Sequence, residues 1–185
     1  MSIEKWDERY RAGEQLFDTP SPLVQRFAVD LPSGAALDLA CGPGRNAIYL
    51  VERGWRVTAV DGSPIAIAKL DERARAKNLE LDARVADLER GEFQIEPDSY
   101  DLICDCYYLQ RDLFPAMRAG IRRSGIAIVI VHLTDVDKPK GTPRLARPGE
   151  LRDYFADWSI LHYYEGPPGE ICHQRAVAEL VALRL

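Results

Sequence analysis

Short apolar runs alternate with amphipathic segments along the first two thirds of the chain. Apolar and β-branched residues concentrate in five runs that predict strands, at residues 35–40, 56–60, 81–85, 100–104 and 126–131. Between them, apolar residues recur three and four positions apart, which predicts helices over 45–53, from Pro64 through Ala74, and from Asp112 through Ile121. Two further short helices are predicted before the first strand, at 2–11 and 23–29. Strands alternating with helices at this spacing predict an α/β fold with helices on both faces of a largely parallel sheet.

The last third of the chain departs from this alternation. Mixed charges with Pro139, Gly141 and Pro143 predict an exposed loop over 134–147, and a helix follows at 148–155. The run Gly166-Pro167-Pro168-Gly169 separates residues 159–164 from 171–183 and predicts a hairpin of antiparallel strands. Residues 176–182 have a composition that also suits a helix, but the hairpin needs a partner strand there.

Length and charge narrow the class of protein. A chain of 185 residues can bury one core, so we expect a single domain over residues 1–185, with residues 1–22 as an N-terminal arm. The net charge of −5 and the scattered basic residues argue against a nucleic-acid partner. No apolar run is long enough to cross a bilayer, and the first ten residues hold no signal-peptide core. We therefore expect a cytoplasmic protein without a membrane partner, whose four cysteines are reduced.

The segment from Asp38 to Gly44 occupies the turn between a predicted strand and a predicted helix. Glycines there let the backbone turn tightly and approach a ligand, and the helix start supplies free N–H groups. Asp61 follows the next strand, 17 residues past Gly44, where a carboxylate can accept hydrogen bonds from both hydroxyls of a ribose. Asp61 could instead be an ordinary loop acid. Together, the glycine turn and the acid favour a site for an adenosine-containing ligand.

Two kinds of adenosine ligand fit such a turn. A dinucleotide cofactor prefers a third glycine, and Ala47 at that position is tolerated, so NAD is not excluded. The acidic Asp38 at the strand end and the C-terminal hairpin argue against NAD.

These motifs resemble class I S-adenosylmethionine-dependent methyltransferases over nearly the whole chain. The resemblance rests on Asp38-x-Ala-x-Gly-x-Gly44, on Asp61 and Asp87, and on the final hairpin. The segments Trp6-Asp7-Glu8-Arg9-Tyr10 and Tyr107-Tyr108-Leu109-Gln110-Arg111 are similar, more narrowly, to tellurite-resistance-type small-molecule methyltransferases. The resemblance implies a Rossmann-like doubly wound seven-stranded sheet of order 3-2-1-4-5-7-6, in which the last strand is antiparallel.

The same resemblance assigns cofactor roles to particular residues. Asp38 and the turn Cys41–Gly44 would hold the methionine end of S-adenosylmethionine, Asp61 the ribose and Asp87 the adenine amino group, with Leu88 against the ring. The first glycine of the family motif is Ala40 here. The full cofactor-binding set expected is Tyr10, Asp38, Ala40, Cys41, Gly42, Gly44, Asp61, Gly62, Asp87, Leu88 and Asp105. Trp6 and Tyr10 would form a lid over the cofactor or a staple that holds the arm to the body.

Candidates for the acceptor side follow the fourth strand. Tyr107 and Tyr108 would line the acceptor pocket or contact the sulfonium by a cation–π interaction, or one of them would pack in the core. Arg111 would bind an anionic acceptor or serve as an ordinary helix-end arginine. His132, at the end of the fifth strand, is the best-placed histidine for a base, unless it is merely a strand terminus.

No metal site is expected. Cys104 and Cys106 lack the spacing of a structural zinc site, and no carboxylate cluster beyond Asp105 supports magnesium.

The sequence thus predicts S-adenosylmethionine-dependent methyl transfer to a small-molecule acceptor, which would be a thiol, a chalcogen oxyanion, an amine or a carboxylate. Positioning the acceptor in line with the methyl group would supply much of the catalysis. The alternatives are a non-catalytic S-adenosylmethionine-binding protein and an NAD-dependent oxidoreductase. The oligomeric state has no signature in the sequence.

Overall fold

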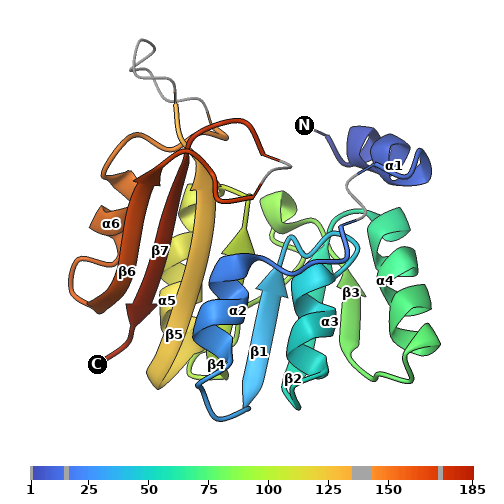
Figure 1. Cartoon of the computed structure of the whole chain (residues 1–185), viewed down its shortest axis with the longest axis horizontal. Helices are drawn as coiled ribbons and strands as arrows, with labels where there is room; N and C mark the ends of the chain where they lie inside the picture. The colour runs from blue at the N-terminus through green and yellow to red at the C-terminus, as the bar shows by residue number, and fades with distance from the viewer. Residues whose placement is uncertain (1, 15–16, 135–142, 171–172) are drawn as a thin grey trace. The chain divides into compact units, whose positions relative to one another are not determined.

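The structure, a computed structural model, describes residues 2–14, 17–134, 143–170 and 173–185 (Figure 1). By its internal packing the chain divides into two compact units, Met1–Gln94 and Ile95–Leu185, and each is described by itself. The expectation of a single domain over residues 1–185 stays a prediction.

Unit 1 is built on three parallel strands in the order β3-β2-β1. Its strands are β1 (Ala35–Leu39), β2 (Arg56–Asp61) and β3 (Asp82–Val85). Its helices are α1 (Ile3–Arg11), α2 (Pro22–Ala28), α3 (Arg45–Val51), α4 (Pro64–Ala76) and the short 3-10 helix η1 (Leu88–Arg90). Helix α3 packs on β1 and β2, and α4 packs on β2 and β3. Because Leu39 pairs with Val60 and Asp61 with Val85, the carboxyl ends of all three strands lie at one edge.

The start of α4 shows how local sequence fixes an element in unit 1. Ser63 is the N-cap residue, and its hydroxyl accepts a hydrogen bond from the Ala66 N–H at 3.0 Å. Pro64 occupies the first turn, where its missing N–H leaves no bond unmade. Ala66, Leu70 and Ala74 are buried along one face, as predicted from their spacing.

Unit 2 holds four strands in the order β4-β5-β7-β6. Its strands are β4 (Tyr100–Cys106), β5 (Ile121–His132), β6 (Ser159–Gly166) and β7 (Val177–Leu183). Its helices are the 3-10 helix η2 (Arg111–Leu113), α5 (Phe114–Gly120) and α6 (Glu150–Tyr154). Strands β4 and β5 are parallel, whereas β7 runs antiparallel to both β5 and β6. The two runs of strands are the two halves of the order 3-2-1-4-5-7-6, and the predicted fold class is confirmed.

The helix predicted from Asp112 through Ile121 is wrong at both ends. A 3-10 turn, η2, precedes α5, and Ile121 is the first residue of β5 instead of the last of the helix. Gly120 allows this abrupt change, because a Cβ there would lie 2.4 Å from the Ile95 side chain. Strand β5 therefore begins five residues before the predicted start at Ile126, with an irregular register between Ile121 and Ile126.

The loop predicted as exposed over 134–147 is tied down at both described ends. Thr134 and Ala146 are buried, and the Thr134 N–H donates to the Ala146 carbonyl at 2.8 Å. The Ala146 N–H in turn donates to the His132 carbonyl at 2.8 Å, so this backbone continues the edge of β5. Residues 135–142, with Pro139 and Gly141, lie outside the described residues.

Strand β7 confirms the choice of strand over helix for residues 176–182. Val177, Ala178, Val181 and Ala182 are fully buried because the strand pairs on both sides, with β5 and with β6. A strand covered by neighbours on both edges is apolar almost throughout.

Gly44 offers a direct test of the turn geometry. It has φ +79°, and a Cβ there would lie 2.2 Å from the Leu70 side chain. We expect Gly44→Ala to lower the free energy of unfolding by about 2–4 kcal/mol, from left-handed strain plus overpacking, as measured by urea titration. Gly13→Ala is the matched control, since Gly13 also has φ +79° but open space around it. We expect it to cost only about 1 kcal/mol. Equal losses in the two variants would contradict the packing argument.

Candidate functional site

The turn after β1 runs through left-handed backbone at three of its five residues. Ala40 has φ +50°, Gly42 +54° and Gly44 +79°. Glycine adopts such angles freely, whereas an L-alanine there carries strain of about 1–2 kcal/mol. The position where the family motif has glycine is thus one where the backbone favours glycine, and Ala40 adopts the same conformation. The turn therefore keeps its left-handed conformation although alanine replaces the first glycine of the motif.

Asp38 anchors this turn from inside the unit. Its side chain is 1% exposed, and its Oδ2 accepts the Ala47 N–H at 3.0 Å. Ala47 is the third residue of α3, where backbone N–H groups have no partner within the helix. Asp38 therefore joins the end of β1 to the start of α3 and sets the direction in which the turn faces.

Asp61 closes the turn from the end of β2. Its Oδ2 accepts the Gly42 N–H and its Oδ1 accepts the Ser63 N–H, both at 2.8 Å. Burial raises the pKa of Asp61, the two backbone hydrogen bonds lower it, and the nearby Asp7 charge adds to the rise; the net shift is upward. A carboxylate oxygen can accept two hydrogen bonds, so each oxygen keeps room for one more donor.

Helix α1 lies over the carboxyl edge of the unit 1 strands (Figure 1). Tyr10, only 6% exposed, places its hydroxyl 3.0 Å from where a Cβ of Gly42 would be, and Ile3 packs in the same way on Gly62. Between them, Asp7 accepts a hydrogen bond from the Ser63 hydroxyl. Burial, followed by the charge of Asp61, raises the pKa of Tyr10, so this tyrosine is a neutral phenol.

The arm thus touches the predicted site at three points along one helical face. Trp6 stacks on Tyr10 at 5.6 Å between ring centroids and supports it. These contacts agree with both alternatives for the arm, the lid and the staple.

Asp87 and Leu88 lie at the end of β3. The Asp87 carboxylate caps η1 by accepting the Glu89 and Arg90 N–H groups at 2.9 and 3.3 Å. Leu88 is buried at 7% exposure. Both residues therefore lie at the same strand edge as Asp61, which is where the resemblance assigns them to the adenine.

Two contributors to this region could not be found from the sequence. Arg73 on α4 donates from Nη1 to the Pro43 carbonyl at 2.6 Å and from Nη2 to Asp18 at 2.8 Å. Ser63 combines helix capping with its bond to Asp7. Both act across more than 25 residues of sequence, and no local pattern marks them.

The cysteine of the turn has a structural character. Cys41 is buried, and its thiol donates weakly to the Gly42 carbonyl at 3.4 Å. Burial, together with the charges of Asp38 and Asp61, raises the pKa of this thiol well above its usual value. A protonated thiol is a poor nucleophile. Cys41 is therefore a structural residue of the turn and does not act as a covalent nucleophile.

The remaining predicted residues belong to unit 2, at the carboxyl end of β4. Asp105 is 1% exposed, whereas Tyr107 and Tyr108 are both half-buried, so neither tyrosine is a core residue. The Tyr107 hydroxyl donates to Glu170 at 2.8 Å, and the Tyr108 hydroxyl donates to Gln110 at 2.6 Å. The two phenols thus point to different partners, and Tyr107 is the one that meets the segment before β7.

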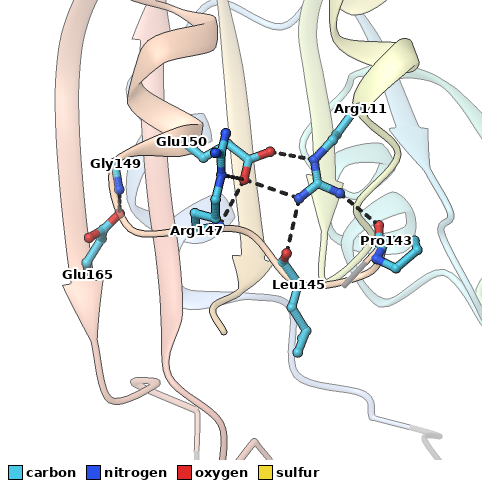
Figure 2. Close-up of polar contacts among 7 residues, drawn as sticks. All are labelled: Arg111, Pro143, Leu145, Arg147, Gly149, Glu150 and Glu165. Atoms are coloured by element: carbon cyan, nitrogen blue, oxygen red, sulfur yellow. Dashed lines mark hydrogen bonds and ion pairs between the residues drawn. The ribbon is translucent and has the colours of Figure 1, made fainter. Parts of the chain in front are cut away.

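Figure 2 shows that Arg111 is held by Glu150 at the start of α6. The guanidinium donates through Nε to Glu150 Oε1 at 2.5 Å and through Nη2 to Oε2 at 3.2 Å. It also donates to the carbonyls of Pro143 and Leu145, both at 3.1 Å. Glu150 is 6% exposed and additionally accepts the Arg147 N–H at 2.9 Å.

This clamp, defined by Arg111 and Glu150, gives Arg111 a structural partner. Bidentate arginine–carboxylate pairs are among the stronger ionic contacts in proteins. An anionic acceptor would therefore have to compete with a buried carboxylate already in place. The geometry favours the alternative of a helix-end arginine, which here positions the backbone of 143–147.

Among the described residues, no group of three or more histidine, cysteine or acidic side chains is arranged to hold a metal ion. Cys172 lies outside those residues. Within the same part of the chain, no helix has both the length and the apolar character needed to span a bilayer.

Comparison with known proteins adds independent information. A family model described as tellurite resistance protein TehB matches residues 6–184. A probable S-adenosyl-L-methionine-dependent methyltransferase TehB from Haemophilus influenzae is 29% identical over 138 residues, covering 70% of this chain and 47% of the relative. A protein named hemagglutinin 1, from Eikenella corrodens, is 33% identical over 135 residues, covering 70% of this chain and 45% of that protein. The chain thus spans about half the length of these relatives.

The crystal structure of TehB from Haemophilus influenzae has the same fold. It superposes with a TM-score of 0.78 at 24% identity, over 97% of this chain and 67% of that one. The resemblance drawn from the sequence motifs is confirmed by the family model and by this fold.

The clamp generates a prediction about stability and pH. Burial alone would raise the pKa of Glu150, but hydrogen bonds from Arg111 and from the Arg147 backbone outweigh it, and the pKa lies below its usual value. Ionised Glu150 therefore stabilises the fold above its unfolded-state pKa of 4.5, and this contribution is lost as the pH falls through the lower, folded-state pKa. We expect Glu150→Gln to cost about 1–3 kcal/mol at pH 7, less than a fully buried pair because Arg111 is partly exposed. Urea unfolding from pH 7 down to acid should show the gap between wild type and variant closing.

Asp157→Asn is the control for this prediction. Asp157 also pairs with an arginine, Arg118, at 2.6 Å, but its side chain is 70% exposed. We expect that variant to change stability by less than about 1 kcal/mol. A gap for Glu150→Gln that stays constant with pH would show that the carboxylate charge is not what stabilises the clamp.

Proposed function

Because this chain belongs to the TehB family of tellurite resistance proteins, we propose that it transfers the methyl group of S-adenosylmethionine to a small-molecule acceptor. The observation that carries the proposal is the Asp61 carboxylate at the end of β2, bonded to the Gly42 N–H of the left-handed turn after β1. In parallel α/β folds, ligands bind at the carboxyl ends of the strands, which is where this pair lies.

The residues present fit an adenosine-containing cofactor. Each oxygen of Asp61 accepts one backbone N–H and has capacity for one further donor, which matches the two hydroxyls of a ribose. A side chain at Gly42 would meet the Tyr10 hydroxyl, and at Gly62 it would meet Ile3, so both glycines let helix α1 pack closely over this strand edge. Asp87 and Leu88, at the end of the neighbouring strand β3, supply a carboxylate and an apolar surface for the adenine.

The residues of the chain would bind and orient the cofactor. The bound cofactor would supply the activated methyl group. Asp38 and the turn Cys41–Gly44 would hold the methionine end, and Gly62 would let the ribose approach Asp61. Tyr10 would cover the site as part of a lid formed by α1, and the hydrogen bond from Ser63 to Asp7 would hold this lid closed. Ala40 and Gly44 shape the turn through their left-handed backbone.

The acceptor side would lie at the carboxyl end of β4, with Asp105, Tyr107 and Tyr108. A small molecule is favoured because the described residues of the connections, 17–134 and 143–170, form no added folded region that would recognise a macromolecule. Its chemical group would be a thiol, a chalcogen oxyanion, an amine or a carboxylate. Methyl transfer is an in-line displacement, so the protein needs to align the acceptor and needs no protein nucleophile.

Calorimetric titration with S-adenosylhomocysteine, beside NAD, tests the cofactor assignment. We expect the wild-type protein to bind S-adenosylhomocysteine and not NAD. Asp61→Asn should weaken that binding about 10- to 100-fold, the effect of losing hydrogen bonds to a charged acceptor. Asn is chosen because its carbonyl oxygen keeps one of the two backbone contacts.

Asp82→Asn is the matched control, since Asp82 is exposed on β3 and accepts hydrogen bonds from the Arg84 and Thr58 side chains. It should bind as the wild type does. Unchanged affinity in a folded Asp61→Asn protein would remove Asp61 from the ribose site, and binding of NAD instead would favour the oxidoreductase alternative.

A further inference from the structure

Helix α4 contacts the turn after β1 through two residues of one helical face. Leu70 packs against Gly44, because a Cβ at that glycine would lie 2.2 Å from the Leu70 side chain. Arg73 follows three residues later, and its Nη1 donates a hydrogen bond to the Pro43 carbonyl at 2.6 Å. Residues three apart are neighbours on the surface of a helix. One element of unit 1 therefore supplies both an apolar and a charged contact to consecutive residues of the turn.

The Pro43 carbonyl needs a donor from outside the turn. Proline has no N–H, so this carbonyl is the sole backbone hydrogen-bonding group of the residue. Pro43 is buried, and a buried carbonyl that lacks a donor is costly. If α3 began one residue earlier, the Ala47 N–H would be that donor, but it is bonded to the Asp38 carboxylate. The Arg73 guanidinium supplies the bond that Asp38 has diverted.

Arg73 is itself held in one orientation. Its Nη2 donates to Asp18 Oδ1 at 2.8 Å and to the Phe17 carbonyl at 3.5 Å, so the planar guanidinium serves two directions at once. The Asp18 side chain is 92% exposed, and an ion pair with so exposed a partner contributes little to stability. The Arg73 side chain is only 22% exposed, and its charge-assisted bond to Pro43 is the stronger of its roles.

Two different groups hold adjacent parts of the turn. Asp61, assigned above to the ribose, accepts the Gly42 N–H at 2.8 Å. Arg73 binds the next residue, Pro43, within the segment assigned to the methionine end. Loss of Arg73 would therefore release the backbone at 43–44, whereas the bond between Asp61 and Gly42 would stay in place.

We propose that Arg73 is a positioning residue for the methionine end of the cofactor, and that it acts through the Pro43 carbonyl. This inference rests on the proposed function. Arg73 holds the backbone at 43–44 in the conformation that receives the amino-acid end, whereas the adenosine half depends on Asp61. A ligand that has the adenosine half alone is consequently insensitive to Arg73.

Two ligands of different length separate these contributions. S-adenosylhomocysteine has both halves, whereas 5′-methylthioadenosine has the adenosine and the sulfur but no amino-acid end. Arg73→Met keeps an unbranched side chain and has no donor. In calorimetric titrations it should weaken binding of S-adenosylhomocysteine about 10- to 100-fold, the effect of leaving the Pro43 carbonyl without its charged donor. It should change binding of 5′-methylthioadenosine by less than about threefold.

Arg73→Lys tests whether the hydrogen bond is the link. Lysine keeps a cation with a donor, so this variant should recover most of the affinity for S-adenosylhomocysteine that Arg73→Met loses. No recovery would overturn the proposal. Equal losses for both ligands in Arg73→Met would show that Arg73 supports unit 1 as a whole, and they would overturn it as well, as would an unchanged affinity for S-adenosylhomocysteine.

Arg75→Met is the matched control on the same helix. The Arg75 side chain is 80% exposed, and it lies 3.9 Å from its partner Asp71. Asp18→Asn is the second control, because it weakens the exposed contact of Arg73 and leaves the contact with Pro43. Both variants should bind both ligands within about twofold of the wild type. A loss in Asp18→Asn as large as that in Arg73→Met would place the effect in the Asp18 pair and overturn the role of Pro43.

A second measurement uses the wild-type protein and needs no variant without a donor. The guanidinium ¹⁵N signals of Arg73 are those that disappear in Arg73→Lys. They should shift when S-adenosylhomocysteine is added and stay in place with 5′-methylthioadenosine. Signals that shift equally with both ligands, or with neither, would overturn the proposal even if Arg73→Met failed to fold.

Failure of this inference can be told apart from failure of the proposed function. A wild-type protein that binds no S-adenosylhomocysteine would overturn the proposed function, and this inference with it. A wild-type protein that binds S-adenosylhomocysteine with an affinity indifferent to Arg73 would overturn this inference alone.

Discussion

The left-handed turn between β1 and α3 is the constraint on which the unit 1 site depends. Three of its five residues have positive φ, and such a backbone is stable only when its polar groups are satisfied from elsewhere. Two carboxylates do this from opposite sides. Asp38 holds the helix that follows the turn, and Asp61 holds the Gly42 N–H within it. The shape of the turn and the placement of the ribose acid are therefore a single arrangement, since a change in either one alters the other.

Helix α1 packs on the strand edge that carries this turn and Asp61. Its residues Ile3, Asp7 and Tyr10 occupy one face at helical spacing, and each contacts a residue of the strand edge that would face a cofactor. The contacts combine an apolar side chain, a hydrogen bond to the Asp7 carboxylate and one neutral phenol, and the Asp7 charge contributes to the raised pKa of Asp61. An element of this kind can hold the arm in place and still be displaced by a ligand that offers the same edge better partners.

In unit 2 the structure distinguishes polar residues with a structural role from polar residues at a candidate site, which the sequence alone does not. The clamp of Arg111 and Glu150 uses a guanidinium to fix backbone at 143–147, so a charge that resembles an anion site from the sequence has a structural task. In the ring cluster of Tyr107, His132 and His173, burial and then the Arg175 charge lower the pKa of His132. Whether a polar residue holds the fold or meets a substrate is thus decided by the partners that the fold gives it.

The sequence by itself determined the alternation of strands and helices, the hairpin at the end, and the turn with its two acids. These follow from periodicity and from the backbone freedom of glycine, which act over a few residues. The exact start of β5 at Ile121, the Arg73 contact with Pro43, the clamp and the ring cluster were decided only by the tertiary structure. Each joins residues that are distant in the chain, or depends on the space around Gly120, and local sequence carries no record of which distant groups will meet. Strand β7 shows where local sequence stops being sufficient. Its composition suits a helix, and only its pairing with β5 and β6 makes it a strand.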